Sequence, residues 1–146
     1  MKKVTLFCDG SALGNPGPGG FGTILRYGDK EKEIVGSDPY TTNNKMELLG
    51  VIEGLKALKE GCEVEIISDS SYVVKGINEW LKNWIKRDFK KVKNPDLWKE
   101  YIKASAPHKI KATWVRGHNG HEENERCDTL ARNEAQKIKD KLNKED

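Results

Sequence analysis

The sequence predicts an α/β fold in which a five-stranded mixed sheet, made of an antiparallel meander plus two parallel strands, is flanked by helices. The first third of the chain reads as short apolar strands separated by glycine-containing turns, and the remainder alternates between helical and strand patterns. Because crossover connections between parallel strands are right-handed, the last two strands are expected to run parallel to the first.

The expected meander consists of strands at residues 4–8, 21–27 and 32–36. The glycine-rich segment 10–20 is expected to form the turn between the first two strands, and Gly28-Asp29 the turn before the third. Asp9 therefore closes the first predicted strand.

The later elements are predicted from apolar periodicity and from residues that begin or end helices. Leu48, Val51 and Leu55 lie on one face of a helix that starts after Asn43-Asn44 and is expected to stop at Gly61. The elements that follow are expected as strand 63–68, a helical segment 71–87 with a break near Gly76, helix 96–104, strand 110–115 and helix 125–142, with a charged tail at 140–146 that frays.

The composition indicates one soluble domain, since the 146 residues are 36% hydrophobic and 34% charged. No apolar run approaches the roughly 20 residues that span a bilayer, and three cysteines without Cys-x-x-Cys spacing indicate neither a disulfide framework nor a zinc ribbon. These features predict a cytoplasmic protein. The net charge is only +3, but the segment 75–93 holds seven Lys or Arg against Glu79 and Asp88, which indicates a polyanionic partner.

Four carboxylates form the strongest functional pattern. Asp9 and Asp69 each follow a buried strand, and Glu47 and Asp128 each lie near the start of an amphipathic helix. Ligands of open α/β sheets bind at the carboxyl ends of the strands, so Asp9 and Asp69 are expected to be neighbours. Buried acids repel one another unless a cation binds among them, and oxygen ligands suit a hard ion such as Mg²⁺. A pair of such ions can promote in-line attack on a phosphodiester.

Each acid alone also has a structural interpretation. Asp9 could start a turn, and Asp69 could cap the helix that follows it. Glu47 completes a capping box with Asn44, although its helical phase places it beside the apolar stripe. Asp128 could be a first-turn acid that the helix dipole favours.

His118 lies in the segment Gly117-His118-Asn119-Gly120-His121, where an imidazole could transfer a proton near neutral pH. A solvated loop histidine is the alternative. Zinc held by His118, His121 and Cys127 is disfavoured because their spacing matches no common zinc finger.

Aromatic and basic residues alternate in the segment that begins at Trp80 and Trp84. This pattern fits either an amphipathic helix packed on a core or a surface on which cations meet phosphates and rings lie against sugars or bases.

Four motifs in the same order carry a family resemblance. They are Phe7-Cys8-Asp9-Gly10-Ser11 with the glycine-rich Gly14-Asn15-Pro16-Gly17-Pro18-Gly19-Gly20, Thr42-Asn43-Asn44-Lys45-Met46-Glu47-Leu48, Ser68-Asp69-Ser70, and Gly117-His118-Asn119-Gly120-His121 leading to Asn124-Glu125-Arg126-Cys127-Asp128. Together they strongly resemble bacterial ribonuclease H of type 1, over nearly the whole chain.

The resemblance implies the ribonuclease H-like fold and endonucleolytic hydrolysis of the RNA strand of RNA·DNA hybrids, which leaves 5′-phosphate and 3′-hydroxyl ends. It implies two Mg²⁺ ions, with Mn²⁺ as the alternative, held by Asp9, Glu47, Asp69 and Asp128. His118 matches the mobile histidine of the family, which assists proton transfer or product departure. The resemblance further implies a cytoplasmic monomer without membrane association or an obligate protein partner.

The substrate contacts are also implied by the resemblance. Contacts to the minor groove and to 2′-hydroxyls are expected from Gly10, Ser11, Asn15, Asn43, Asn44 and Glu47. A phosphate of the DNA strand is expected to bind in a pocket formed by Thr42 and Asn94. A basic protrusion at about 75–95 is expected to contact the substrate through Trp80, Lys82, Lys86 and Arg87. Two departures predict weaker hybrid binding. Ser71 stands where a glutamine commonly contacts RNA, and the protrusion is shorter than in the best-known bacterial members.

Two other classes of function compete with this interpretation. A non-catalytic hybrid-binding module would lack one or more acids, and all four are present. The second class comprises other metal-dependent enzymes: a proofreading-type nuclease on the same fold and a phosphatase of the haloacid-dehalogenase class. Both would need a second acid two residues after Asp9, and that position is Ser11.

Overall fold

A computed structural model describes residues 1–116 and 122–144 of the chain. Its five strands are β1 (Lys2–Ala12), β2 (Gly17–Tyr27), β3 (Lys30–Thr41), β4 (Cys62–Ser68) and β5 (Lys109–Trp114). They form one sheet in the order β3-β2-β1-β4-β5, with β1–β2 and β2–β3 antiparallel and β1–β4 and β4–β5 parallel. The predicted mixed sheet is therefore confirmed, including its parallel second half.

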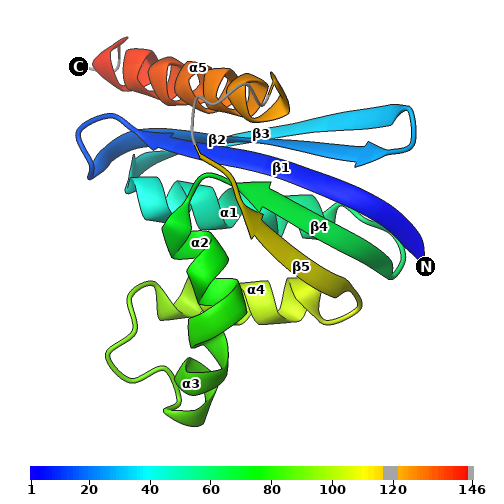
Figure 1. Cartoon of the computed structure of the whole chain (residues 1–146). Coiled ribbons are helices and arrows are strands. Elements are labelled where there is room, and N and C mark those ends of the chain that lie inside the picture. Colours follow the sequence, from blue (N-terminus) through cyan, green and yellow to red (C-terminus); the bar gives the residue numbers. More distant parts are fainter. Residues whose placement is uncertain (117–121, 145–146) are drawn as a thin grey trace.

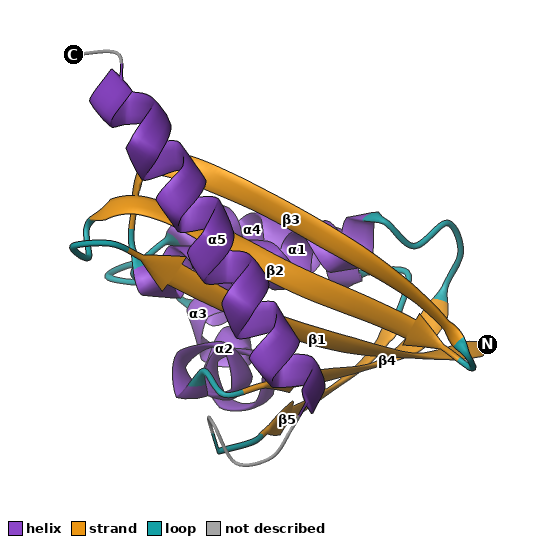
Figure 2. Ribbon diagram, turned by 90° about the horizontal axis from the view of Figure 1, so that it is seen from above, coloured by secondary structure: helices purple, strands orange, loops and turns teal. Residues whose placement is uncertain are grey.

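Helices cover both faces of this sheet (Figure 1). Helix α5 (Glu122–Lys144) crosses one face over β1 and β2, and α1 (Asn43–Lys56) packs on the opposite face together with α4 (Pro95–Ser105). Figure 2 shows α5 lying along the sheet with α1 and α4 behind it. The main core lies on the α1 side, where Leu6, Val51, Ile66 and Trp98 are fully or almost fully buried.

The predicted turn at residues 10–20 is wrong, because most of this segment is strand. Strand β1 continues to Ala12 and pairs with Gly19, Gly20 and Phe21 of β2. Glycine is used here for close packing: a Cβ on Gly20 would lie 2.7 Å from the Ala131 carbonyl oxygen of α5. The absent side chains let α5 approach the sheet backbone.

Two helix starts also differ from the capping interpretations. Thr42 is the N-cap of α1, since its Oγ1 accepts a hydrogen bond from the Lys45 N–H at 3.3 Å, and Asn44 is already inside the helix. Ser70 caps α2 (Ser71–Lys75) by accepting from the Val73 N–H at 3.2 Å. Neither Glu47 nor Asp69 is therefore used as the cap of its helix.

The predicted break near Gly76 is a change of helix type. Helix α2 continues directly into a π-helical turn, η1 (Gly76–Trp80), and then into α3 (Leu81–Lys86). Gly76 lies against the indole of Trp98 in α4, where an added Cβ would be 2.3 Å from Cη2. The π-helical turn, α3 and the loop after it project from the body of the domain (Figure 1).

Among the described residues, no helix is both long and apolar enough to cross a membrane. Cys8, Cys62 and Cys127 are buried with free thiols.

Candidate active site

Three of the four predicted acids meet at one edge of the sheet. The parallel register that pairs Phe7 with Ile67 places Asp9 of β1 level with Asp69, which follows β4. Glu47 comes from α1, whose backbone crosses so closely that a Cβ on Gly10 would lie 2.4 Å from the Glu47 nitrogen. One carboxylate oxygen from each acid lies within 4.8 Å of the other two. We call Asp9, Glu47 and Asp69 the carboxylate cluster.

Burial and mutual repulsion perturb this cluster. Burial raises the pKa of Asp9 from its ordinary value of 3.8 to about 6; a hydrogen bond with Glu47 opposes the rise and the charge of Asp69 adds to it. Burial, followed by the charge of Asp9, raises the pKa of Glu47 well above its ordinary value. Without a cation, the cluster therefore holds a proton close to neutral pH.

The donor atoms of the cluster fit a hard divalent cation. Glu47 is only 8% exposed, and its Oε2 is buried without a hydrogen-bond partner among the described residues. An unpaired buried carboxylate oxygen is costly, and a cation at this position would supply its missing partner. Oxygen-only ligands match Mg²⁺ or Mn²⁺ better than zinc.

The fourth acid, Asp128, stands apart from the cluster. It lies close enough to add to the rise in the pKa of Asp9, but its Oδ2 is 2.9 Å from Nη2 of Arg132, one turn further along α5. Asp128 is partly buried, with 22% of its side chain exposed. The structure thus places Asp128 beside the cluster with its charge already paired.

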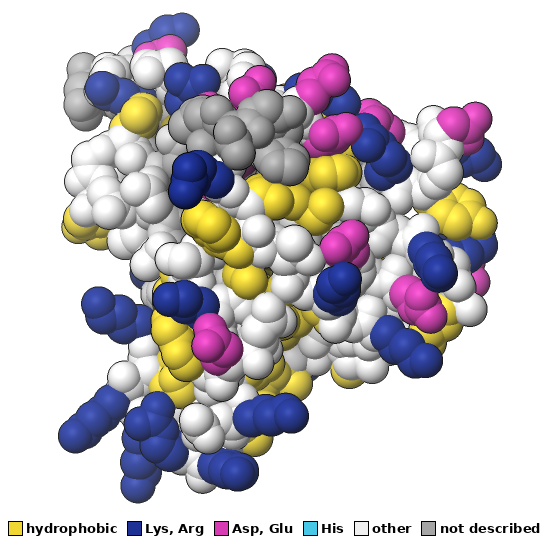
Figure 3. Space-filling view, in the orientation of Figure 1, with side chains coloured by type: hydrophobic (Ala, Val, Ile, Leu, Met, Phe, Trp, Pro, Cys, Tyr) yellow, Lys and Arg dark blue, Asp and Glu magenta, His cyan; other side chains and the backbone are white. Residues whose placement is uncertain are grey.

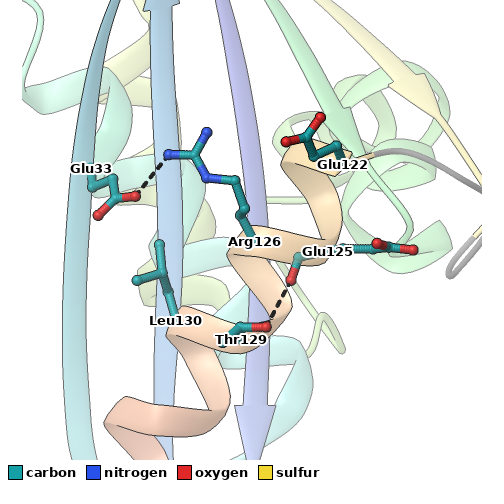
Figure 4. A pocket seen from close by; sticks show the side chains of 6 residues that line it. All are labelled: Glu33, Glu122, Glu125, Arg126, Thr129 and Leu130. Carbon is teal, nitrogen blue, oxygen red and sulfur yellow. Dashed lines mark hydrogen bonds and ion pairs between the residues drawn. The ribbon is translucent and has the colours of Figure 1, made fainter.

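Ion pairs hold the start of α5 on the β2–β3 hairpin. Arg126 donates to Glu31 and Glu33 of β3 at 3.0 and 2.8 Å, and Figure 4 shows its guanidinium reaching Glu33. Arg26 of β2 pairs with Glu31 and with Glu123 of α5. Beside these pairs lies an open hollow of about 310 Å³, lined by Glu33, Glu122, Glu125, Arg126, Thr129 and Leu130 (Figure 4). These contacts set the position of Asp128 relative to the sheet.

His118 lies outside the described residues, so its role in proton transfer or product departure stays a prediction.

A polar hollow of about 450 Å³ lies near the N-terminus of α1. It is lined by Asn15, Thr42, Asn43, Asn44, Lys93 and Asn94. The Asn43 side chain accepts from the Ala12 N–H at 2.6 Å, and Asn15 accepts from the Asn43 N–H at 2.9 Å. Both amide oxygens are thus occupied, which leaves each NH₂ group as a donor for a bound acceptor. We call this hollow the polar pocket.

The predicted basic protrusion is only partly a packed helix. Trp84 packs against Trp98 with ring centroids 5.1 Å apart, and Trp80 lies next to Trp84 but remains 38% exposed. Figure 3 shows Lys and Arg side chains gathered at this end of the molecule, over α3 and the following loop. Ser71 is exposed at the first turn of α2. The packed-helix interpretation is therefore confirmed for Trp84, and the nucleic-acid surface stays a prediction for the exposed residues.

Two aromatic residues near the site were not predicted. Trp114 ends β5, and its Nε1 donates to the backbone carbonyl of Asp69 at 3.0 Å. Tyr72 in α2 bonds to residues that line the polar pocket. For Trp114, strand periodicity could have indicated its place, because it is an apolar residue at the end of an edge strand. The contacts of Tyr72 depend on tertiary structure.

Comparison with known proteins decides the family. The family model for RNase H matches residues 1–136. The chain belongs to the ribonuclease H family.

Relatives within the ribonuclease H family match over nearly their whole length. The chain is 69% identical to a ribonuclease H of Sulfurovum sp. (strain NBC37-1) over 141 residues, covering 97% of this chain and 96% of that protein. It is 59% identical to a ribonuclease HI of Helicobacter pylori (strain ATCC 700392 / 26695) over 137 residues, covering 94% and 96%.

A solved structure confirms the ribonuclease H fold. The crystal structure of LC9-RNase H1, described as a type 1 RNase H with the type 2 active-site motif, superimposes with a TM-score of 0.87 at 33% identity. The match covers 94% of this chain and 74% of that one.

Proposed function

We propose that this protein is a metal-dependent endonuclease that hydrolyses the RNA strand of RNA·DNA hybrids and leaves 5′-phosphate and 3′-hydroxyl ends. Membership of the ribonuclease H family supports the reaction class. The observation that carries the proposal is the carboxylate cluster, in which three acids lie within 4.8 Å and Glu47 keeps a buried oxygen without a partner. Without a cation the acids of this cluster repel one another or must hold a proton, so the arrangement favours the binding of a cation.

Asp9, Glu47, Asp69 and Asp128 are the residues that would hold two Mg²⁺ ions, with Mn²⁺ as an alternative. When bound, such ions activate a water for in-line attack and stabilise the leaving 3′-oxygen. Asp9 and Glu47 release the proton that the empty cluster holds, since their raised pKa values favour protonation only without a cation. His118 is proposed to carry a proton during the reaction or product departure.

Recognition of the hybrid is assigned to donors that flank the cluster. The NH₂ groups of Asn15 and Asn43, fixed through their amide oxygens, would donate to 2′-hydroxyls or to other acceptors of the minor groove. Gly10 and Ser11 belong to the same strand as Asp9, and Asn44 and Glu47 to the first turns of α1. The backbone and side chains at these positions would follow the RNA strand.

The DNA strand is assigned to the polar pocket and the protrusion. Thr42 and Asn94 line the pocket, in which a phosphate would be received. Lys82, Lys86 and Arg87 are exposed on the protrusion, and the half-exposed ring of Trp80 offers a face for a sugar. The acids and the pocket come from one chain, so we propose that a monomer in the cytoplasm acts without an obligate protein partner.

The test is a cleavage assay on three end-labelled duplexes: an RNA·DNA hybrid, duplex RNA and duplex DNA, each with Mg²⁺ and with EDTA. Only the hybrid with Mg²⁺ should be cut, in its RNA strand. Asp69→Asn should abolish cleavage and retain most hybrid binding. Glu53→Gln, on the other side of α1, is the matched acid control and should cleave normally.

Cleavage of the hybrid by folded Asp69→Asn at a near-normal rate would contradict the metal assignment. Binding without cleavage by the unaltered protein would instead support a non-catalytic hybrid-binding module, and cutting of duplex DNA would support another nuclease activity.

A further inference from the structure

The hydroxyl of Tyr72 joins three segments of the chain. It accepts hydrogen bonds from Trp98 Nε1 at 2.9 Å and from Asn94 Nδ2 at 3.1 Å, and it donates to the Lys93 carbonyl oxygen at 3.4 Å. A phenolic hydroxyl has one hydrogen and two lone pairs, so all of its bonding capacity is used. Tyr72 is the second residue of α2, a helix that follows Asp69 and the cap Ser70.

Two of these partners form one wall of the polar pocket. Lys93 and Asn94 line it from the protrusion side, whereas Asn15, Thr42, Asn43 and Asn44 line it from the side of α1. The α1 side is held by its own hydrogen bonds, from Ala12 to Asn43 and from Asn43 to Asn15. The Asn94 carbonyl oxygen accepts from the Trp98 N–H of α4 at 3.2 Å, but among the hydrogen bonds of the described residues only Tyr72 holds the Asn94 side chain and the Lys93 carbonyl.

Several residues of the loop on that side have left-handed backbone conformations, and the loop needs such support. Asn94 has a left-handed conformation with φ 57° and ψ 47°, and its side chain makes no capping bond to α4. Asp88, Phe89 and Lys91 in the same loop also have positive φ. Asparagine and aspartate adopt this conformation readily, but Phe89 and Lys91 keep it only where their surroundings fix them. The amide of Asn94 is fixed through one N–H to Tyr72, which leaves its second N–H and its oxygen for the pocket.

We propose that Tyr72 is a positioning residue for the DNA strand, whose hydroxyl holds Asn94 and the Lys93 carbonyl in place and so fixes the polar pocket relative to Asp69. This inference rests on the proposed function. The helix that carries Tyr72 begins right after Asp69, so one short segment links the wall of the pocket to the carboxylate cluster. Loss of the hydroxyl would free this wall and leave the acids unchanged.

The chain offers a matched pair of substitutions. Tyr72→Phe removes the hydroxyl but keeps the ring, which packs edge-on against Trp98 at a centroid distance of 5.8 Å. Tyr101→Phe is the control, because Tyr101 packs on the same indole at 5.7 Å and its hydroxyl bonds to Ser105 within α4. Both variants lose one hydroxyl from a ring that packs on Trp98, and only one of them loses a contact to the pocket.

Steady-state kinetics on an RNA·DNA hybrid should separate the two variants. Tyr72→Phe should raise KM roughly tenfold, as expected for a pocket donor that is no longer held in place, while kcat changes by less than about twofold. Tyr101→Phe should leave both constants within about twofold of the unaltered protein. Thermal unfolding of both variants shows whether lost stability alone explains the result.

A second measurement reports on the pocket itself. Hybrids whose DNA strand carries a neutral methylphosphonate at successive positions should show one position that weakens binding by the unaltered protein. This penalty should shrink in Tyr72→Phe and in Asn94→Ala, and combining the two substitutions should add little further loss.

Equal KM values for Tyr72→Phe and Tyr101→Phe, or an unchanged methylphosphonate penalty in Tyr72→Phe, would overturn the positioning role. Failure of the unaltered protein to cleave any hybrid would overturn the proposed function instead, so the two failures are distinguishable.

Discussion

Arg132 forms an ion pair with Asp128 one turn earlier on α5, with 2.9 Å between Nη2 and Oδ2. The other three predicted acids face one another, and Asp128 instead faces this guanidinium. A cation that takes Asp128 as a ligand must compete with Arg132. The Arg132 side chain is 64% exposed, so solvent weakens the pair and makes it easy to displace.

Arg132→Gln is therefore expected to tighten the binding of the more weakly held divalent ion by roughly two- to fivefold, the range that corresponds to an exposed ion pair. The measurement is calorimetric titration of Mg²⁺ or Mn²⁺ into metal-free protein, which does not depend on activity. Lys137→Gln is the charge-matched control, since Lys137 pairs with Glu134 on the same helix. Equal affinities in the two variants would show that Arg132 acts only through net charge or not at all.

The sequence allowed prediction of the sheet and of two of the three clustered acids for one physical reason. Asp9 and Asp69 follow strands that periodicity identifies, and the handedness of crossovers then makes them neighbours. Side-chain pairing could not be predicted in the same way. The ion pair of Asp128 depends on a rotamer, and the hydrogen bonds of Tyr72 depend on a loop with left-handed residues that no local pattern specifies. The glycine-rich segment was mistaken for a turn because several of its glycines lie in strands and serve close packing, Gly10 against α1 and Gly20 against α5.

Asp9→Asn is expected to stabilise the metal-free protein at neutral pH by about 3 kcal/mol, since one pKa unit corresponds to about 1.4 kcal/mol. The folded pKa of Asp9, about 6, lies above the ordinary value of 3.8, so the folded state binds the proton more tightly. The contribution of Asp9 is fully present below pH 3.8 and is lost as pH rises through about 6.

Urea unfolding of both proteins in EDTA between pH 4 and about 7 tests this sign. The difference in unfolding free energy should grow with pH in favour of Asp9→Asn, and Mg²⁺ should reverse it by binding the unaltered protein. A constant difference across the range would mean that Asp9 is not perturbed.

Gly76→Ala is expected to destabilise the fold by about 1–3 kcal/mol, because the new methyl group overlaps the indole of Trp98. The built Cβ lies 2.3 Å from Cη2 and 2.5 Å from Cζ2. Gly28→Asn is the control, since Gly28 has φ 60° with no atom within 4 Å and asparagine tolerates that conformation. The free energy of unfolding in urea should fall for Gly76→Ala alone. Equal values for the two variants would mean that Trp98 moves aside at no cost.

Replacing Lys86, Arg87 and Lys90 with Ala is expected to weaken hybrid binding and to reduce the slope of log K against log salt by about one to three, since each lost phosphate contact removes about 0.9 from it. All three side chains are exposed on or next to α3. Saturated turnover should change little, because the carboxylate cluster is untouched.

The control for this substitution replaces Lys30, Lys32 and Lys59 with Ala, which removes the same charge at the end of the sheet away from α3 (Figure 1). Long-range attraction depends on net charge and would weaken equally in both triple variants. A contact with phosphates releases counterions locally, so the slope of log K against log salt should decrease only in the α3 variant. Binding isotherms at several salt concentrations measure it, and an equal slope in both variants would return these residues to an ordinary solvated surface.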